Sequence, residues 1–173
     1  FPSYEYLQMF VEQADIPGDS FLYQERNGES AEYKILREKF ESNSSCVLGI
    51  VLGGSFSESI DFGNMKLSGV IVISMALPPS SLERDLTKRH FDEEKGSPWG
   101  SLIAYERPAL NRVIQAVGRL VRSQSDRGVV CLVDPRFEQA QVKSLMPSIW
   151  EPISVAKLEV EATLDDFWSS EHS

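Results

Sequence analysis

The chain has 173 residues, of which 42% are hydrophobic and 25% are charged. This length suits one domain with a sizeable core, and this composition excludes a disordered chain. No apolar run approaches the length of a membrane span, and the first residues do not form a signal peptide, so no membrane partner is expected. The net charge of −9 argues against a freestanding basic nucleic-acid clamp.

Short apolar runs alternate with helical periodicity along the chain, which is the pattern of an α/β fold. Three continuous apolar runs predict strands that are buried on both faces of a parallel sheet. The expected elements, in chain order, are a helix over 4–14, a strand over 21–23, a helix over 29–41, strands over 46–52 and 69–75, a helix with a capping box at Ser80 and Glu83, a loop over 92–100, a helix over 108–123, a strand over 128–133 and a short last helix capped by Thr163 or Asp166.

Arginine is concentrated in one stretch of this acidic chain. From Arg107 to Arg136 there are six arginines, two aspartates and no lysine, a net charge of +4, which leaves −13 for the rest of the chain. Arginine is the planar, permanently charged side chain that suits phosphate groups. The stretch therefore indicates either a phosphate-binding surface or a solvated helix face.

A helix over 109–122 would have two distinct faces. At 100° per residue, the apolar residues lie within an arc of about 120°. Gln115, Gly118, Arg119 and Arg122 lie within an arc of about 100° on the opposite side. An interior glycine costs about 1 kcal/mol relative to alanine, so Gly118 predicts the close approach of a ligand or another backbone. Two guanidinium groups and an amide on one rigid face predict a polyphosphate site; a polar face that packs against nothing is the alternative.

A glycine-rich segment follows the predicted strand over 46–52. Ligand sites in open α/β sheets lie at the carboxyl ends of strands, and Gly53 and Gly54 permit close backbone approach there. Glu58 and Asp61 could accept hydrogen bonds from a ribose hydroxyl or pair with arginines. Alternatively, the segment is an ordinary turn, with Asp61 as a cap.

Three blocks of the sequence together resemble the second motor lobe of DinG/XPD-like DNA helicases, which belong to helicase superfamily two. Residues 1–4 (F-P-S-Y) resemble motif IV, residues 55–62 (S-F-S-E-S-I-D-F) resemble motif V, and residues 115–123 (Q-A-V-G-R-L-V-R-S) resemble motif VI. The downstream residues 126–128 (D-R-G) and 134–137 (D-P-R-F) also fit the family. Ser59 departs from the pattern, because the family usually has glycine there.

The resemblance implies a RecA-like three-layer sandwich with a mostly parallel central sheet, whose first strand is missing from this chain. That lobe would span 1–150, and 151–173 would be a C-terminal extension with a short helix. The family's phosphate-binding loop, magnesium-binding acidic box and four iron–sulfur cysteines belong to the first lobe, and this sequence has none of them. Cys46 and Cys131 alone cannot hold a metal or iron–sulfur site, and the chain is expected to be cut from a longer protein.

The resemblance also implies ATP and Mg²⁺ at the interface with the first lobe of the same protein, which would hold any 4Fe–4S cluster. Arg119 and Arg122 would act as arginine fingers, and Gln115 would orient the phosphate or the attacking water. The other implied contacts are Glu58, Asp61 and Gly118 with ATP, and Ser3, Tyr4, Ser55 and Phe56 with single-stranded DNA.

The resemblance further implies 5′ to 3′ movement, a role in DNA repair, a monomeric protein, and a cytoplasmic location in a bacterium with a DinG-type helicase. By itself the chain is expected to show no ATPase activity. The alternative is a non-catalytic RecA-like interaction or regulatory module, in which Arg119 and Arg122 bind a partner's acidic surface. His90 and His172 are the only histidines, so a Ser-His-Asp hydrolase or a zinc site is not expected.

Overall fold

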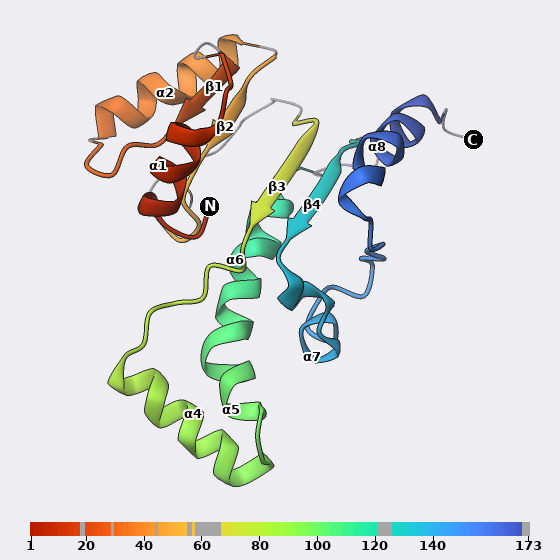
Figure 1. The fold of residues 1–173 in the computed structure, drawn as a ribbon. Helices are drawn as coiled ribbons and strands as arrows, with labels where there is room; N and C mark the ends of the chain where they lie inside the picture. The colour runs from red at the N-terminus through yellow and green to blue at the C-terminus, as the bar shows by residue number, and fades with distance from the viewer. Residues whose placement is uncertain are drawn as a thin grey trace.

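The computed structural model describes residues 1–17, 20–28, 30–43, 45–54, 57, 67–120 and 126–170. It confirms an α/β fold (Figure 1). The α-helices are α1 (Tyr4–Gln13), α2 (Ser30–Ser42), α4 (Leu82–Lys95), α5 (Trp99–Ser101), α6 (Arg107–Val117), α7 (Ala140–Lys143) and α8 (Val160–Ser169). The strands are β1 (Phe21–Tyr23), β2 (Val47–Gly49), β3 (Gly69–Ile73) and β4 (Val129–Val133). A π-helix, η2 (Leu102–Glu106), precedes α6, and the 3₁₀ helices η3 (Pro135–Glu138) and η4 (Lys157–Glu159) precede α7 and α8.

The parallel pair β1–β2 lies between two helices, α1 and α2 (Figure 1). On one face, Leu7 of α1 packs with Phe21 and Val51. On the other face, Phe40 of α2 packs with Leu22 and residues near β2. Successive strand residues point to opposite faces, so Phe21 of β1 packs against α1 and Leu22 of β1 packs against α2. The helices and the strand pair thus form three layers.

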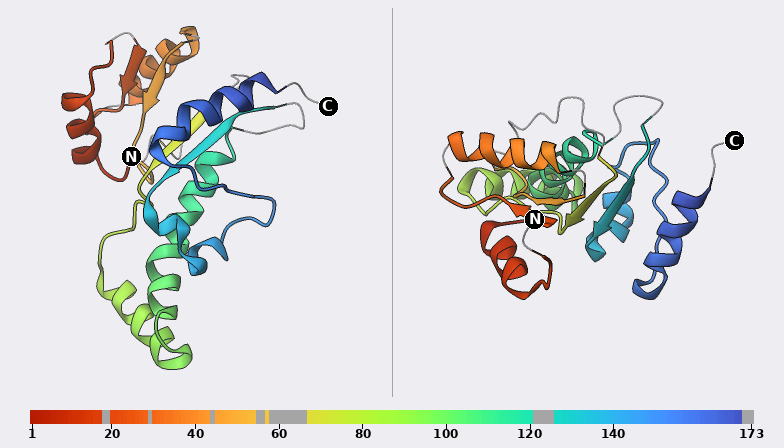
Figure 2. Two further views of the ribbon diagram at one scale, coloured as in Figure 1. Left: turned by 45° about the vertical axis from the view of Figure 1, so that its right-hand side comes forward. Right: turned by 90° about the horizontal axis from the view of Figure 1, so that it is seen from above.

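The parallel pair β3–β4 rests on α6 and α7 (Figures 1 and 2). Val72 of β3 is buried against a core that includes Leu110 and Val113 of α6. Its neighbour Ile71, which points to the opposite face, is 63% exposed. Burial on both faces of this strand was therefore a wrong prediction, because an apolar run reveals the chemistry of a strand but not whether a second element packs on it.

The described strands fall into two hydrogen-bonded pairs, β1–β2 and β3–β4, and both are parallel as expected. The main-chain oxygen of Gly49 accepts from Gln24 N on the side of β1. Next along the chain, Ile50 O and Leu52 N bond to the main chain of Phe1. Because successive carbonyls of a strand point to opposite edges, Phe1 occupies the edge of the β2 segment that faces away from β1.

Helix α4 extends further than predicted, because residues 92–95 belong to the helix and not to the predicted loop over 92–100. Ion pairs at i,i+4 spacing, such as Lys88–Asp92 at 2.8 Å, stabilise a helix of this polar composition. His90 lies exposed on it, in the solvated position expected. The N-cap of α4 is Ser81, whose side chain accepts a hydrogen bond from Arg84 N, and not the predicted Ser80.

Two other helix boundaries differ from the prediction. The predicted helix over 108–123 begins earlier, at Arg107 directly after η2, and its α-helical part ends at Val117. The last helix begins at Val160, so Thr163 lies inside it and donates from Oγ1 to the Glu159 carbonyl oxygen. No helix in the described ranges is both long and apolar enough to cross a membrane.

Candidate functional site

Helix α6 has the two faces that its sequence predicted. Leu110, Val113 and Val117 are buried in the core beneath β3 and β4. Gln115 lies exposed on the other side, and Arg119 is half-buried just beyond the end of the helix. The apolar face thus anchors the helix to the core and leaves Gln115 on the exposed side.

Gly118 ends α6 instead of lying inside it, with φ −61° and ψ −8° at the C-cap. The prediction of an interior glycine is therefore wrong, and the interior penalty does not apply. A Cβ at Gly118 would meet only the Ile114 and Gln115 carbonyl oxygens within 4 Å, among the residues that the structure describes. No other described backbone approaches Gly118, so the predicted close approach of another backbone is also wrong within that part of the chain, and Gly118 remains exposed.

Arg112 links α6 to the glycine turn that follows β2. Gly53 has a φ of +74°, and a Cβ there would lie 2.8 Å from both Cζ and Nε of Arg112. The guanidinium group therefore lies directly against the Gly53 backbone. Arg112 is three residues before Gln115, so the two share one side of the helix. The polar side of α6 consequently faces the glycine turn.

Sequence reasoning missed Arg112 as a site residue, although it was counted in the arginine-rich stretch. The available signal was its i,i+3 spacing with Gln115, which places both on one helix face. What the spacing could not reveal is the partner, because Gly53 is 59 positions away in the sequence and only the tertiary fold brings it there.

Gln24 joins the start of α1, helix α2 and the end of β2. Its side chain is buried, and Nε2 donates to the hydroxyls of Tyr4 at 2.6 Å and Tyr33 at 3.2 Å. Oε1 accepts from Val51 N at 3.2 Å. Burial raises the pKa of the Tyr4 phenol, so its hydroxyl is neutral at physiological pH. Gln24 was also missed, because one glutamine after a short strand has no distinctive sequence signal.

Ser3 and Tyr4 both have hydrogen-bond partners within the domain, and their contact with single-stranded DNA stays a prediction. Ser3 caps α1 by accepting from Tyr6 N at 3.2 Å. A Cβ at Gly54 would lie 3.5 Å from Tyr4 Oη, so Tyr4 lies beside the same turn as Arg112. The structure thus brings the N-terminal segment, the glycine turn and α6 together.

A pocket of about 510 Å³ opens beside Tyr4, between α1 and the segment after β1. Its lining includes the aromatic residues Tyr4 and Tyr23, and its charged and polar residues include Glu5, Glu25, Arg26 and Asn27. Arg26 is exposed and donates to Glu5 Oε1 at 2.6 Å. Aromatic and polar groups around an open pocket provide stacking surfaces and hydrogen-bond donors in the same place.

Half of the predicted site residues lie outside the described residues. These are Arg122, Ser55, Phe56, Glu58 and Asp61. Their roles therefore stay predictions. The described residues of the set, Gln115, Gly118, Arg119, Ser3 and Tyr4, lie on α6, on the turn after it and at the start of α1.

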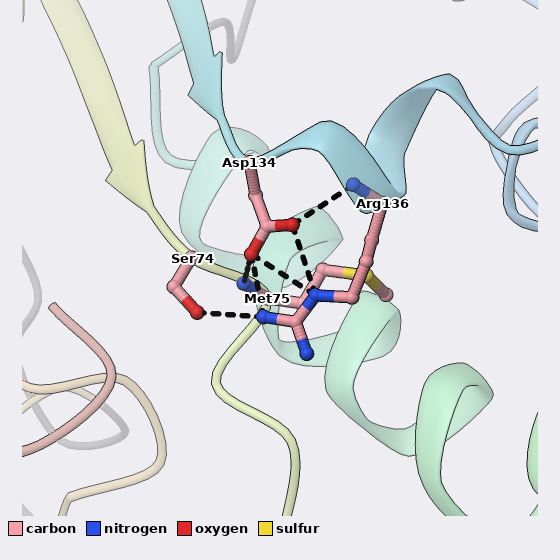
Figure 3. Close-up of polar contacts among 4 residues, drawn as sticks. All are labelled: Ser74, Met75, Asp134 and Arg136. Atoms are coloured by element: carbon pink, nitrogen blue, oxygen red, sulfur yellow. Dashed lines mark hydrogen bonds and ion pairs between the residues drawn. The ribbon is translucent and has the colours of Figure 1, made fainter.

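Asp134 and Arg136 tie together the carboxyl ends of β3 and β4 (Figure 3). Asp134 accepts from Arg136 Nη2 at 2.5 Å, from Arg136 N at 2.9 Å and from Met75 N at 3.3 Å. Arg136 also donates to Ser74 Oγ at 2.9 Å. Ser74 and Ala76 have φ values of 71° and 50°, which are costly for residues with a Cβ. The pair thus supports a strained turn.

The Arg136 guanidinium lowers the pKa of Asp134 from its usual 3.8 to about 2. Because the folded value is the lower one, this stabilisation is complete above about pH 4 and is lost as pH falls toward about pH 2. We expect Asp134→Asn to lower the free energy of unfolding at pH 7 by about 2 kcal/mol. Urea denaturation at several pH values should also show that the free energy of unfolding of this variant depends less on pH between about pH 4 and pH 2.

Asp165→Asn on the exposed surface of α8 is the matched control, and it should follow the unsubstituted chain at every pH. If the free energy of unfolding falls with pH as steeply in Asp134→Asn as in the unsubstituted chain, the ion pair with Arg136 does not account for the acid dependence of stability.

The two cysteines do not fit an iron–sulfur cluster. Cys46 and Cys131 are free, and Cys46 Sγ donates to the Asn43 carbonyl oxygen at 3.3 Å. Within the described ranges, no three His, Cys, Asp or Glu side chains gather closely enough to hold a metal ion.

A family model described as the helicase C-terminal domain matches residues 1–153. The chain belongs to this family. This helicase C-terminal domain contains the glycine turn, α6 and the Asp134–Arg136 pair within the matched residues. The predicted family is therefore confirmed.

The helicase C-terminal domain is similar to proteins named regulator of telomere elongation helicase 1. It is 35% identical over 118 residues to the protein of Rattus norvegicus, an alignment that covers 64% of this chain and 9% of that protein. It is 29% identical over 161 residues to the homolog of Drosophila grimshawi, covering 84% of this chain and 16% of that protein. The chain thus spans only a small part of these relatives.

Solved structures of XPD share the fold. A structure titled XPD helicase aligns with a TM-score of 0.64 and 22% identity, covering 84% of this chain and 26% of that one. A structure titled XPD apo aligns with a TM-score of 0.65 and 23% identity, covering 84% and 29%. The RecA-like α/β fold is therefore confirmed, while the bacterial source and the cytoplasmic location stay predictions.

Proposed function

We propose that this domain is the second motor lobe of an ATP-dependent DNA helicase. The observation that carries the proposal is the contact of Arg112 with Gly53, because it turns the polar side of α6 toward the glycine turn. Membership in the helicase C-terminal domain family supports the same function. ATP and Mg²⁺ would bind between this lobe and the first lobe of the same protein.

In this proposal, Arg119 and Arg122 act as arginine fingers. They stabilise the negative charge that develops on the γ-phosphate as it is transferred to water. Gln115 orients the phosphate or the attacking water, and Gly118 leaves room for the nucleotide at the end of α6. The exposed position of Gln115 and the half-buried position of Arg119 support these roles.

The surface beside the glycine turn would contact single-stranded DNA. Ser3 and Tyr4, with Ser55 and Phe56, would touch the strand, and the open pocket beside Tyr4 supplies aromatic rings and polar groups. Glu58 and Asp61 would report the state of the nucleotide to this surface. Closure of the lobes on ATP and opening after hydrolysis would move the protein in the 5′ to 3′ direction.

The full-length protein is expected to hydrolyse ATP when single-stranded DNA is added and to unwind a duplex with a 5′ tail. The isolated chain is expected to hydrolyse no ATP, because it has no phosphate-binding loop. Colorimetric phosphate release, measured on both proteins with and without DNA, provides the test.

Two results would contradict the proposal. Robust hydrolysis by the isolated chain would place a complete ATPase site within these residues. A full-length protein without DNA-stimulated hydrolysis would instead favour the non-catalytic module, in which Arg119 and Arg122 bind an acidic partner.

A further inference from the structure

Helix α8 lies beyond residues 1–153, and it lies near β4 (Figures 1 and 2). It contacts Arg127, which lies two residues before β4 begins at Val129. The Arg127 guanidinium carbon lies 4.4 Å from the centre of the Phe167 ring and 5.4 Å from that of Trp168. The two rings meet edge to face, with their centroids 5.0 Å apart. They therefore form an aromatic corner around one cation.

Hydrogen bonds add to this contact. Arg127 Nη2 donates to the carbonyl oxygen of Phe167 and, at 3.0 Å, to Ser170 Oγ. Among the described residues, Arg127 Nε is buried and has no hydrogen-bond partner. The guanidinium group is thus held in one orientation by α8, although Arg127 as a whole is half-buried.

Gly128, the residue after Arg127, contacts the turn that follows α6. A Cβ at Gly128 would lie 2.6 Å from Cδ1 of Leu120, so the Leu120 side chain lies directly on the Gly128 backbone. Leu120 is only 4% exposed, and it directly follows Arg119. A continuous series of contacts therefore runs from α8 through Arg127 and Gly128 to the turn that holds Arg119.

We propose that α8 is a positioning element of the motor, which holds Arg127 and Gly128 against Leu120 and so fixes Arg119 at the nucleotide. This inference rests on the proposed function, in which Arg119 contacts the γ-phosphate. Phe167 and Arg127 touch neither ATP nor DNA in it; they act through Leu120. In the sequence, these contacts lie at Leu120 on one side of Arg122 and at Arg127 and Gly128 on the other side.

The test replaces Phe167 by leucine in the full-length protein, which keeps the apolar volume but removes the ring face. The matched control is Phe91→Leu on α4, because Phe91 also lies beside a cation. Lys95 Nζ is 5.6 Å from the centre of the Phe91 ring. Helix α4 lies at the opposite end of the domain from α8 (Figure 1). Phe167→Tyr keeps an aromatic face and is the conservative variant.

Hydrogen–deuterium exchange measures the positioning without relying on activity. We expect Phe167→Leu to speed amide exchange in peptides over 117–128 about tenfold, while Phe91→Leu and Phe167→Tyr leave those peptides unchanged. Equal exchange in Phe167→Leu and the unsubstituted protein would overturn the proposal.

DNA-stimulated ATP hydrolysis measures the consequence for the motor. Phe167→Leu should lower kcat about tenfold with little change in the KM for ATP or in DNA affinity, since only an interaction with the transition state is impaired. A kcat equal to that of Phe91→Leu would overturn the proposal. If the unsubstituted protein hydrolyses no ATP, the proposed function fails, and the exchange result still decides whether α8 positions residues 117–128.

Discussion

Replacing Arg119 with alanine in the full-length protein is expected to lower DNA-stimulated ATP hydrolysis about 10³-fold. The loss follows because the guanidinium group would no longer neutralise charge on the transferring phosphoryl group. Affinity for single-stranded DNA should remain, since the proposed strand contacts lie at Ser3 and Tyr4 and not on the turn after α6. Steady-state phosphate release and fluorescence anisotropy with labelled DNA measure the two properties separately.

The matched control is Arg89→Ala, which removes an exposed arginine from α4 and should leave turnover unchanged. Arg119→Lys keeps the charge but loses the planar fork, so it should recover only part of the activity. Arg122→Ala should likewise abolish ATP-driven unwinding while leaving DNA binding largely intact. Unchanged turnover in Arg119→Ala would refute the finger role of this residue.

Replacing Gly53 with alanine is expected to lower the free energy of unfolding by about 3 kcal/mol, combining left-handed strain with overpacking. The residue has φ +74°, and the new Cβ would overlap the Arg112 guanidinium group. Because this contact orients the polar side of α6, DNA-stimulated turnover should fall as well. Urea denaturation and phosphate release provide the two measurements.

Two further variants separate the causes of this loss. Gly96→Ala also has a positive φ, +83°, but its Cβ would meet nothing within 4 Å among the described residues, so it should lower stability without lowering turnover. The pair Gly53→Ala and Arg112→Ala should cost about 1 kcal/mol less together than the sum of the single variants, because Arg112→Ala removes the overlap. Additive losses would show that Arg112 does not press on the Gly53 backbone.

Local sequence patterns predicted several elements well. The strand over 21–23 and the apolar face of α6 follow from short-range chemistry, because side chains alternate in strands and repeat every 3.6 residues in helices. The same local patterns were wrong for α4, where charged residues that suit a loop also form ion pairs one turn apart. They were wrong at the end of α6 as well, since the apolar period continues past Val117 although the helix does not.

The amino-acid sequence was sufficient to indicate the α/β class, the helicase family and the polar side of α6, because these depend on residue order and on spacing along one segment. The contacts of Arg112 with Gly53, of Gln24 with Tyr4, and of Arg127 with Phe167 appear only in the folded chain. Each joins residues 20 or more positions apart, and no local period encodes such a pairing. Packing between elements decides which side chains meet, so the surroundings of the proposed nucleotide site are a property of the tertiary structure.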